Sequence, residues 1–163
     1  MRTTRHISNS RERARAPITS FAAQVAEVDV DPGTGQVKVK KLTTVHDSGT
    51  VLNHLGYTGQ IDGGVVTGLG FALMEDNSLV DGKMAATNLG EFKMATVADV
   101  PKLTTVLMQA ATGPAPFQGK AIAEIPNVPT AAAIANAIED AVGVRLHDLP
   151  LTSEKIYRAL NKR

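Results

Sequence analysis

Alternating apolar and polar residues predict a β-hairpin near the start of the folded part of the chain. Between Ser20 and Val30 apolar positions come to alternate with acids, and from Val37 they alternate with lysines. The sequence DPGTG at 31–35 is typical of a turn, because proline presets φ and glycine allows a positive φ. The alternation slips at 40–41, where two lysines adjoin, and this predicts a bulge or a sheet edge.

A period of 3.6 residues predicts three helices further along the chain. The first lies within Gly56–Leu73, the second covers Asn127–Val142, and the third follows a capping Thr152. Asn127 is the expected cap of the second helix, and Gly143 is suited to end it. The apolar stripes are Ile61, Val65, Val66, Leu69 and Leu73 in the first helix, Ile134, Ile138, Ala141 and Val142 in the second, and Ile156, Ala159 and Leu160 in the third.

Four glycines interrupt the first helix, at Gly63, Gly64, Gly68 and Gly70. Each costs a helix up to about 1 kcal/mol relative to alanine. We therefore expect something to approach this helix closely, either another part of the backbone or a ligand. Gln60 lies near the expected helix start, where free N–H groups and the helix dipole favour polar partners, and its amide can both donate and accept hydrogen bonds.

The rest of the chain predicts a small hairpin at 77–84, an irregular stretch at 87–101 and a strand over Leu103–Ala110. A loop rich in small residues follows, and then 120–125 reads as an extended, buried segment with a single carboxylate, Glu124. This residue is either a catalytic base or an ordinary polar side chain. Apolar neighbours would raise its pKa by desolvation, which suits a general base.

Composition and spacing exclude several function classes. The chain has no cysteine, which rules out disulfides and thiolate-bound iron–sulfur or zinc sites within it and fits a reducing, cytoplasmic setting. No apolar run reaches membrane-spanning length. His46, Asp47 and Ser48 are consecutive, so they cannot normally align as a hydrolase triad, and His46 and His54 lack zinc-ligand spacing.

The positive charge of the chain is concentrated at its start. Five arginines against one glutamate give residues 1–16 a charge of +4, so the remainder carries −3 of the total of +1. Because no aromatic residues are interleaved with these arginines, a nucleic-acid partner is disfavoured. We expect a disordered basic tail over residues 1–17 and one folded domain over 18–163.

Three segments, in matching order, resemble the molybdenum hydroxylases, the family of xanthine dehydrogenases, aldehyde oxidases and carbon monoxide dehydrogenases. They are DSGTVLNHLGYTGQIDGGVVTGLGFAL at 47–73, TNLGEFKMATVADVP at 87–101 and GKAIAEIPNVPTAAAIANAI at 119–138. The resemblance covers roughly Ser20 to Leu160. It implies an α+β fold, a two-layer domain with a mixed β-sheet packed by helices, equivalent to the C-terminal part of the molybdopterin-binding subunit.

The resemblance also implies a cofactor and a set of site residues. The cofactor is molybdenum held by molybdopterin, often as the cytosine dinucleotide in bacteria. Glu124 matches the catalytic glutamate, which takes a proton from a molybdenum-bound hydroxide. Gln60 matches a glutamine that reaches the oxo ligand, Gly59, Lys120 and Ala121 are further expected cofactor-binding residues, and no residue ligates the metal directly. The expected activity is hydroxylation of aldehydes or N-heterocycles with oxygen from water.

The chain departs from the family pattern in sequence and in length. Ala123 replaces a glycine before the glutamate, Phe92 a common tyrosine and Ala95 a common proline. The family subunit is several times longer, so the expected partners are its remaining portion and iron–sulfur and FAD subunits. Alone, the chain is expected to be inactive, to bind no cofactor and to form a homo-oligomer. The alternative is a non-catalytic scaffold or oligomeric interaction module that keeps the fold and has lost the cofactor.

Overall fold

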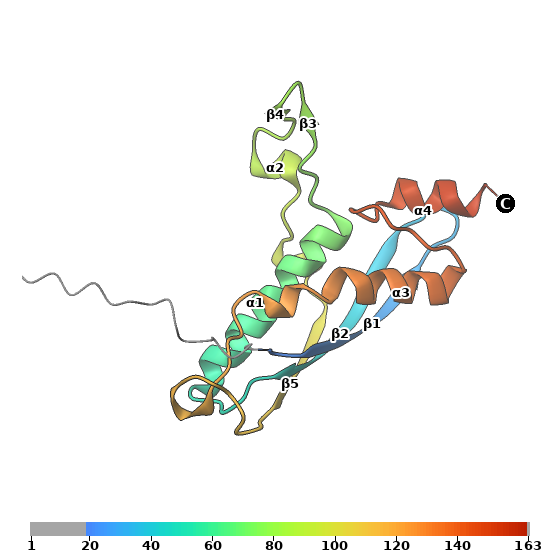
Figure 1. The fold of residues 1–163 in the computed structure, drawn as a ribbon. Helices are drawn as coiled ribbons and strands as arrows, with labels where there is room; N and C mark the ends of the chain where they lie inside the picture. Colours follow the sequence, from blue (N-terminus) through green and yellow to red (C-terminus); the bar gives the residue numbers. More distant parts are fainter. Residues whose placement is uncertain (1–18, 163) are drawn as a thin grey trace, which may run out of the picture.

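The computed structural model describes residues 19–162, and the basic tail expected at 1–17 lies outside this part. The described residues form a three-stranded sheet, two helices across it, a C-terminal helix and a projecting arm (Figure 1). No helix among them is long and apolar enough to cross a membrane. The expected α+β class with a mixed sheet and packed helices is confirmed.

The sheet has the order β1-β2-β5 and mixes strand directions. Strands β1 (Ala22–Val30) and β2 (Val37–Asp47) form the predicted antiparallel hairpin, and β5 (Lys102–Met108) runs parallel to β2. The register shifts between Glu27 and Val28, opposite the adjacent lysines, and this confirms the predicted bulge. Because β5 is parallel to β2, a long crossover connects them, and helix α1 lies in that crossover.

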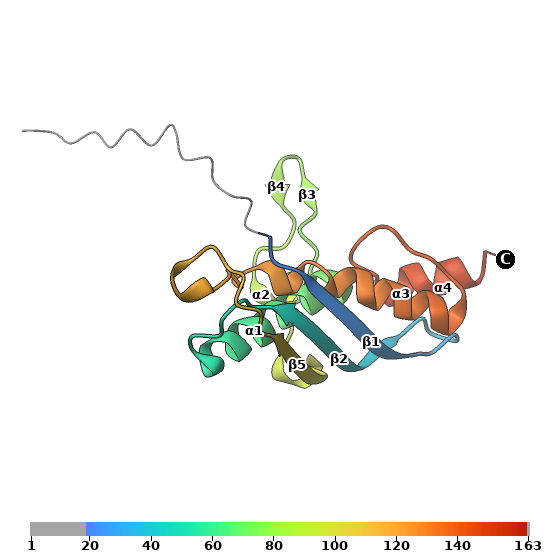
Figure 2. The same cartoon turned by 60° about the horizontal axis from the view of Figure 1, so that its bottom comes forward.

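One face of the sheet is covered by helices α1 (His54–Leu73) and α3 (Thr130–Val142). Helix α3 lies along β1, α1 contacts β5, and the two helices touch each other (Figures 1 and 2). Apolar side chains from the sheet and both helices meet between the layers and remove their surface from water, which is the main stabilising term of the fold. The buried cluster comprises Val39, Leu42, Ile61, Val65, Leu69, Ala72, Ile134, Ala135, Ile138, Leu151 and Ile156.

Two of the helix glycines allow a close approach within the chain itself. A Cβ atom at Gly68 would lie 2.5 Å from Cβ of Thr130, and one at Gly64 would lie 3.0 Å from Cβ of Pro126. The seam between α1 and the start of α3 therefore has no room for larger residues. By contrast, no atom of residues 19–162 lies within 4 Å of a Cβ added at Gly63, so packing within this part of the chain does not explain this glycine.

The C-terminal helix α4 (Ser153–Leu160) closes the far end of the hairpin. Its predicted cap is confirmed, because Thr152 Oγ1 accepts from the backbone N–H of Lys155 at 3.3 Å. The hairpin turn packs against it: Gly35 has φ of +73°, and a Cβ there would lie 2.1 Å from the backbone oxygen of Ser153. Glycine is thus required at this position both for the backbone conformation and for the contact.

The segment before α3 differs from the prediction. Residues 120–125 are not a buried strand, because Ala121, Ala123 and Glu124 are exposed and a short 3-10 helix, Ile125–Asn127, follows. Helix α3 begins only at Thr130, with Pro129 at its N-cap position, so Asn127 does not cap it. Proline has no backbone N–H to leave unpaired, which suits it to a helix entry. At the other end, Gly143 (φ of +69°) ends α3 as predicted.

The residues that follow α1 and precede β5 in the sequence form a small arm that projects from the body of the domain (Figure 1). It contains strands β3 (Leu79–Val80) and β4 (Lys83–Met84), the predicted small hairpin, and the single-turn helix α2 (Leu89–Phe92). The arm buries little, because every residue of its two strands is exposed and α2 has no buried residue. Its exposed large apolar side chains include Leu79, Val80, Met84, Leu89 and Met94.

The other face of the sheet carries no helix among the described residues. The outward side chains at one end are apolar and exposed: Phe21 and Val25 on the β1 side, Val106 and Met108 on β5. At the other end they are charged, where Lys41 pairs with Glu27 at 3.2 Å and Lys40 with Asp29 at 2.7 Å. We call this surface the open face.

Candidate functional site

Glu124 lies in the connection between β5 and α3, just before the 3-10 helix. Its backbone oxygen accepts a hydrogen bond from the N–H of Asn127 at 3.2 Å, so Glu124 is the residue at which this short helix starts. The side chain is exposed, and among the described residues the carboxylate has no hydrogen-bond or ion-pair partner. The expected desolvation by apolar neighbours is therefore wrong for this chain alone, because Ala121 and Ala123 are exposed too.

Lys120 is held by the end of β2. Its Nζ lies 2.5 Å from Oδ2 of Asp47, and the two side chains are only 10% and 15% exposed. Its backbone N–H donates to the oxygen of Ser48 at 3.3 Å, and an isolated bridge joins Gly49 to Gly119. The hydrogen bond from Lys120 is the main cause that lowers the pKa of the Asp47 carboxyl. The ammonium of Lys120 thus anchors the Glu124 segment to the sheet.

Ala121 and the loop before it complete this segment. Ala121 is exposed, and its backbone oxygen accepts from the hydroxyl of Ser20 at 3.2 Å. The loop has a tight, left-handed turn at Phe117 (φ of +59°) and Gln118 (φ of +63°), which is an uncommon conformation outside glycine. The N–H of Gly113 donates to the oxygen of Gln118 at 3.1 Å and closes the loop.

Gln60 and Gly59 lie on α1, but not at its first turn as expected. The helix begins at His54, where the side chain of Asn53 accepts from the N–H of Gly56 at 2.9 Å, so Gln60 is the seventh residue. Its position lies beyond the N–H groups that a helix start leaves free. Gln60 is exposed, and none of the described residues has an atom within 4 Å of a Cβ added at Gly59.

The fold nevertheless brings the Gln60 face of α1 to the Glu124 segment. Residues four apart share one face of a helix, so Gln60 lies one turn from Gly64. Gly64 packs against Pro126, which is two residues after Glu124. The two expected site residues therefore come from separate parts of the sequence to one region of the surface. Both project into open space, since each is exposed.

The remaining polar groups near the end of β2 do not form another catalytic arrangement. Ser48 Oγ donates to the backbone oxygen of His46 at 3.3 Å and not to its imidazole, which agrees with the exclusion of a hydrolase triad. Within residues 19–162, no group of three or more histidine, cysteine, aspartate or glutamate residues could hold a metal ion.

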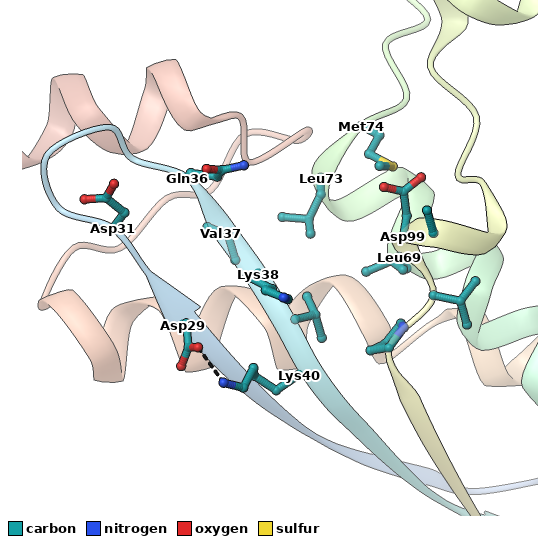
Figure 3. Close-up of a pocket in the computed structure, with 14 residues that line it drawn as sticks. Asp29, Asp31, Gln36, Val37, Lys38, Lys40, Leu69, Leu73, Met74 and Asp99 are labelled. Atoms are coloured by element: carbon teal, nitrogen blue, oxygen red, sulfur yellow. Dashed lines mark hydrogen bonds and ion pairs between the residues drawn. The ribbon is translucent and has the colours of Figure 1, made fainter.

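The structure also reveals two features that the sequence did not predict. One is the Asp47–Lys120 pair, for which the only signal was the aspartate in the resemblance at 47–73. The other is a cavity of about 570 Å³ between the hairpin, the C-terminal end of α1 and residues 98–101 (Figure 3). None of the expected site residues lines this cavity, and its Asp29 is already paired with Lys40.

The exposed residues are suited to receive a bound group. Gly59 and Gly63 are four residues apart on one helix face, and a side chain at either would occupy space that is empty here. Gln60 offers an amide and Glu124 a carboxylate without protein partners among the described residues. Open glycines beside unpaired polar side chains leave room for a flat, polar cofactor, so the residues present fit such a group.

Known proteins similar to this chain share its sequence pattern and its fold. The family model described as "Molybdopterin cofactor-binding domain" matches residues 2–101, which include Gln60 but not Glu124. The chain is 35% identical over 141 residues to the xanthine dehydrogenase molybdenum-binding subunit of Escherichia coli O157:H7, covering 85% of this chain and 19% of that protein. It is 39% identical over 141 residues to an aldehyde oxidoreductase of Megalodesulfovibrio gigas, covering 86% of this chain and 15% of that protein.

The structural comparison agrees. The solved aldehyde oxidoreductase of Desulfovibrio gigas superimposes with a TM-score of 0.80 at 35% identity, over 87% of this chain and 15% of that one. The chain thus spans about a fifth or less of the length of these relatives. Because the family model matches more than half of the chain, the chain belongs to the molybdopterin cofactor-binding domain family.

Proposed function

We propose that the chain supplies the Gln60 and Glu124 side of a molybdenum cofactor site in a molybdenum hydroxylase. One observation carries the proposal. Gln60 and Glu124 are both exposed and have no partner among the described residues, and they lie in one region of the surface together with Gly59 and Gly63, whose Cα atoms face empty space. Gln60 and Gly59 lie within the family match. The proposed domain comprises residues 18–163.

Each residue has a role that its surroundings allow. When bound, molybdenum with its pterin supplies the two-electron redox chemistry. The amide of Gln60 donates a hydrogen bond to a polar group of the cofactor, and the carboxylate of Glu124 accepts the proton that the attacking water gives up. Lys120 and Ala121 contribute through backbone groups other than the Lys120 N–H and the Ala121 oxygen, because these two groups and the Lys120 ammonium already have partners within the chain.

The proposed reaction is the hydroxylation of an aldehyde or N-heterocycle, as the names of the relatives suggest for those proteins. The molybdopterin is proposed to carry a cytosine nucleotide, which makes the cofactor the cytosine dinucleotide form. Acid release of nucleotide from the assembled enzyme, followed by mass spectrometry, tests this form. Recovery of cytidine monophosphate in equal amount to molybdenum supports it, and its absence from molybdenum-loaded enzyme excludes it.

The chain is proposed to act with a further polypeptide that completes the site. A general base must reach its proton in a site closed to bulk water, and the exposed Glu124 lacks such closure here. The open face and the arm both expose apolar side chains that a partner can cover. The proposed partners are the remaining portion of the molybdenum subunit and iron–sulfur and FAD subunits, in the cytoplasm.

The test uses the assembled enzyme with Glu124→Gln. The amide keeps the shape of the side chain but cannot accept the proton, so turnover should fall by 100-fold or more, on the order of a general-base contribution. Molybdenum content, measured by elemental analysis, should be unchanged. Glu27→Gln on the exposed hairpin is the control, and it should keep full turnover. Full activity of Glu124→Gln would contradict the assigned role.

The scaffold alternative is favoured by one observation, the number of apolar side chains exposed on the arm and the open face. A module that serves only to hold other chains would use the same surfaces and would need no cofactor. Elemental analysis of the assembly purified from its source separates the two functions. Stoichiometric molybdenum supports the cofactor site, whereas a full complement of partners without molybdenum supports the scaffold.

A further inference from the structure

A cluster of buried polar atoms lies beneath the Glu124 segment. Within residues 19–162, Oε1 of Gln24, Oγ1 of Thr44 and both ring nitrogens of His46 are buried and have no hydrogen-bond partner. Thr44 is 2% exposed and His46 is fully buried. Nearly all buried polar groups in proteins are paired, so four unpaired atoms on three neighbouring side chains call for an explanation.

Strand register brings these side chains together on the face that the helices cover. Gln24 lies directly opposite Thr44 in the β1–β2 pair, and His46 lies opposite Ala22, two residues further along β2. Opposed residues have Cβ atoms about 4.5–5.5 Å apart, and residues two apart on a strand share a face at roughly 7 Å. The row continues across the sheet to Thr105, whose hydroxyl donates to Asp62 of α1 at 2.5 Å.

The chemistry of these atoms requires a group that both donates and accepts. Burial is the main cause that lowers the pKa of His46, which favours the neutral imidazole with one donor nitrogen and one acceptor nitrogen. The hydroxyl of Thr44 also does both, and Oε1 of Gln24 only accepts. Water both donates and accepts hydrogen bonds, and buried waters typically make about three such bonds.

We propose that Gln24, Thr44 and His46 form an internal water site that orients Gln24 and, through it, the Glu124 segment. The other end of the same amide, Nε2 of Gln24, donates to the backbone oxygen of Pro126 at 2.7 Å. That oxygen also accepts from the hydroxyl of Thr130 at 3.2 Å. A water on Oε1 fixes which way the amide faces, so that Nε2 points to Pro126.

Gln24 is therefore a positioning residue, because it holds the backbone two positions after Glu124. Its importance for turnover rests on the proposed function of Glu124. The water site itself does not, since it depends only on residues inside the fold. The two ideas can consequently fail separately.

The water site is tested by a crystal structure of the full chain, or of the assembly that contains it, at a resolution that reveals ordered water. The expected result is a water within about 2.7–3.2 Å of at least two of the four unpaired atoms. A second measurement compares chemical denaturation of Thr44→Val with that of Thr43→Val, which changes the same residue type on the other face of β2. Thr44→Val should unfold at a lower denaturant concentration than Thr43→Val.

If the cluster holds no water, Thr44→Val should instead stabilise the chain, because it replaces an unpaired buried hydroxyl by a methyl group and so removes the desolvation cost of that hydroxyl. The absence of ordered water, or a Thr44→Val variant at least as stable as Thr43→Val, would overturn the proposal.

The positioning role has its own readout, the backbone amide of Asn127, which donates to the oxygen of Glu124. Gln24→Met keeps the length of the side chain but removes its amide. Hydrogen exchange at Asn127 should then become at least fivefold faster, while exchange at Gly35 in the hairpin turn stays unchanged. Unchanged exchange at Asn127 would overturn the positioning role whatever the activity of Glu124.

Discussion

Both faces of the sheet carry apolar residues at alternate positions of the strands, but only one of the two faces is buried by the described residues. On the covered face, Leu42 and Val39 are buried against α1 and α3. On the open face, Val25 and Val106 remain 64% and 44% exposed, although they lie on β1 and β5, the two strands that flank β2. Alternation thus identifies two faces, but it does not say which of them the chain itself covers.

The open face also differs from one end to the other. Near the hairpin turn it carries the exposed pairs Glu27–Lys41 and Asp29–Lys40. Near the Glu124 segment it is apolar, and its ion pair Asp47–Lys120 is nearly enclosed. The apolar end of the open face therefore lies at the same end of the sheet as the candidate site. This arrangement suits a partner that covers both at once.

The largest expected effect separates the two faces directly. Leu42→Ala removes a side chain that is 1% exposed and leaves a cavity, so the free energy of unfolding should fall by about 2–5 kcal/mol. Val25→Ala on the open face should cost less than about 1 kcal/mol, because most of the Val25 side chain is already exposed to water in the folded state. Chemical denaturation measures both. Equal losses would show that the open face is covered in solution.

The second effect compares the two ends of the open face. Lys120→Met leaves the Asp47 carboxylate sheltered without its cation and should cost roughly 2–3 kcal/mol, less than a fully buried pair because both groups keep some contact with water. Lys40→Met breaks an exposed pair and should change stability by less than about 1 kcal/mol. Denaturation at neutral pH measures the difference, and equal effects would contradict the enclosure.

This pair also gives a pH dependence. The lowered pKa of folded Asp47 means that its contribution is fully present above the ordinary carboxyl value of 3.8 and is lost as pH falls through the lower folded pKa. Native stability should therefore decrease as pH falls below about 4, and Lys120→Met should flatten that part of the curve. If Lys120→Met loses stability below about pH 4 as steeply as the unmodified chain, the pH dependence does not come from the Asp47–Lys120 pair.

The third effect concerns α1, which has a packed side and an open side. Gly68→Ala places a methyl group 2.5 Å from Cβ of Thr130 and should cost about 1–3 kcal/mol. Gly63→Ala makes the same change where no other described residue lies within 4 Å, and the better helix propensity of alanine should stabilise the chain by up to about 1 kcal/mol. Thermal unfolding measures both signs, and stabilisation by Gly68→Ala would contradict the close packing.

The smallest effect on stability tests the open face as a contact surface. Val106→Lys should change the free energy of unfolding by no more than about 0.5 kcal/mol, as for other surface substitutions. It should, however, reduce self-association of the isolated chain, measured by sedimentation velocity, because it interrupts the apolar surface. Lys102→Arg, at the charged end of the open face on the same strand, is the control. Unchanged association in Val106→Lys would exclude this face from the contact.

The sequence by itself determined the local elements. Periods of 2 and 3.6 residues predicted the hairpin, the bulge at 40–41, α1 and α4, because side-chain direction in a strand or helix follows from local geometry alone. Its motifs also indicated the family that the comparison established. Gln60 and Glu124 were named from those motifs, and their roles remain predictions.

Tertiary structure decided the surroundings of these residues. The exposure of Glu124, the capture of Lys120 by Asp47 and the packing of Gly64 against Pro126 each join segments far apart in the sequence. The unpaired atoms of Gln24, Thr44 and His46 likewise depend on strand register and on what lies over the sheet. Burial and pairing are properties of such long-range contacts, and a local pattern of apolar and polar residues carries no information on which distant segment makes them.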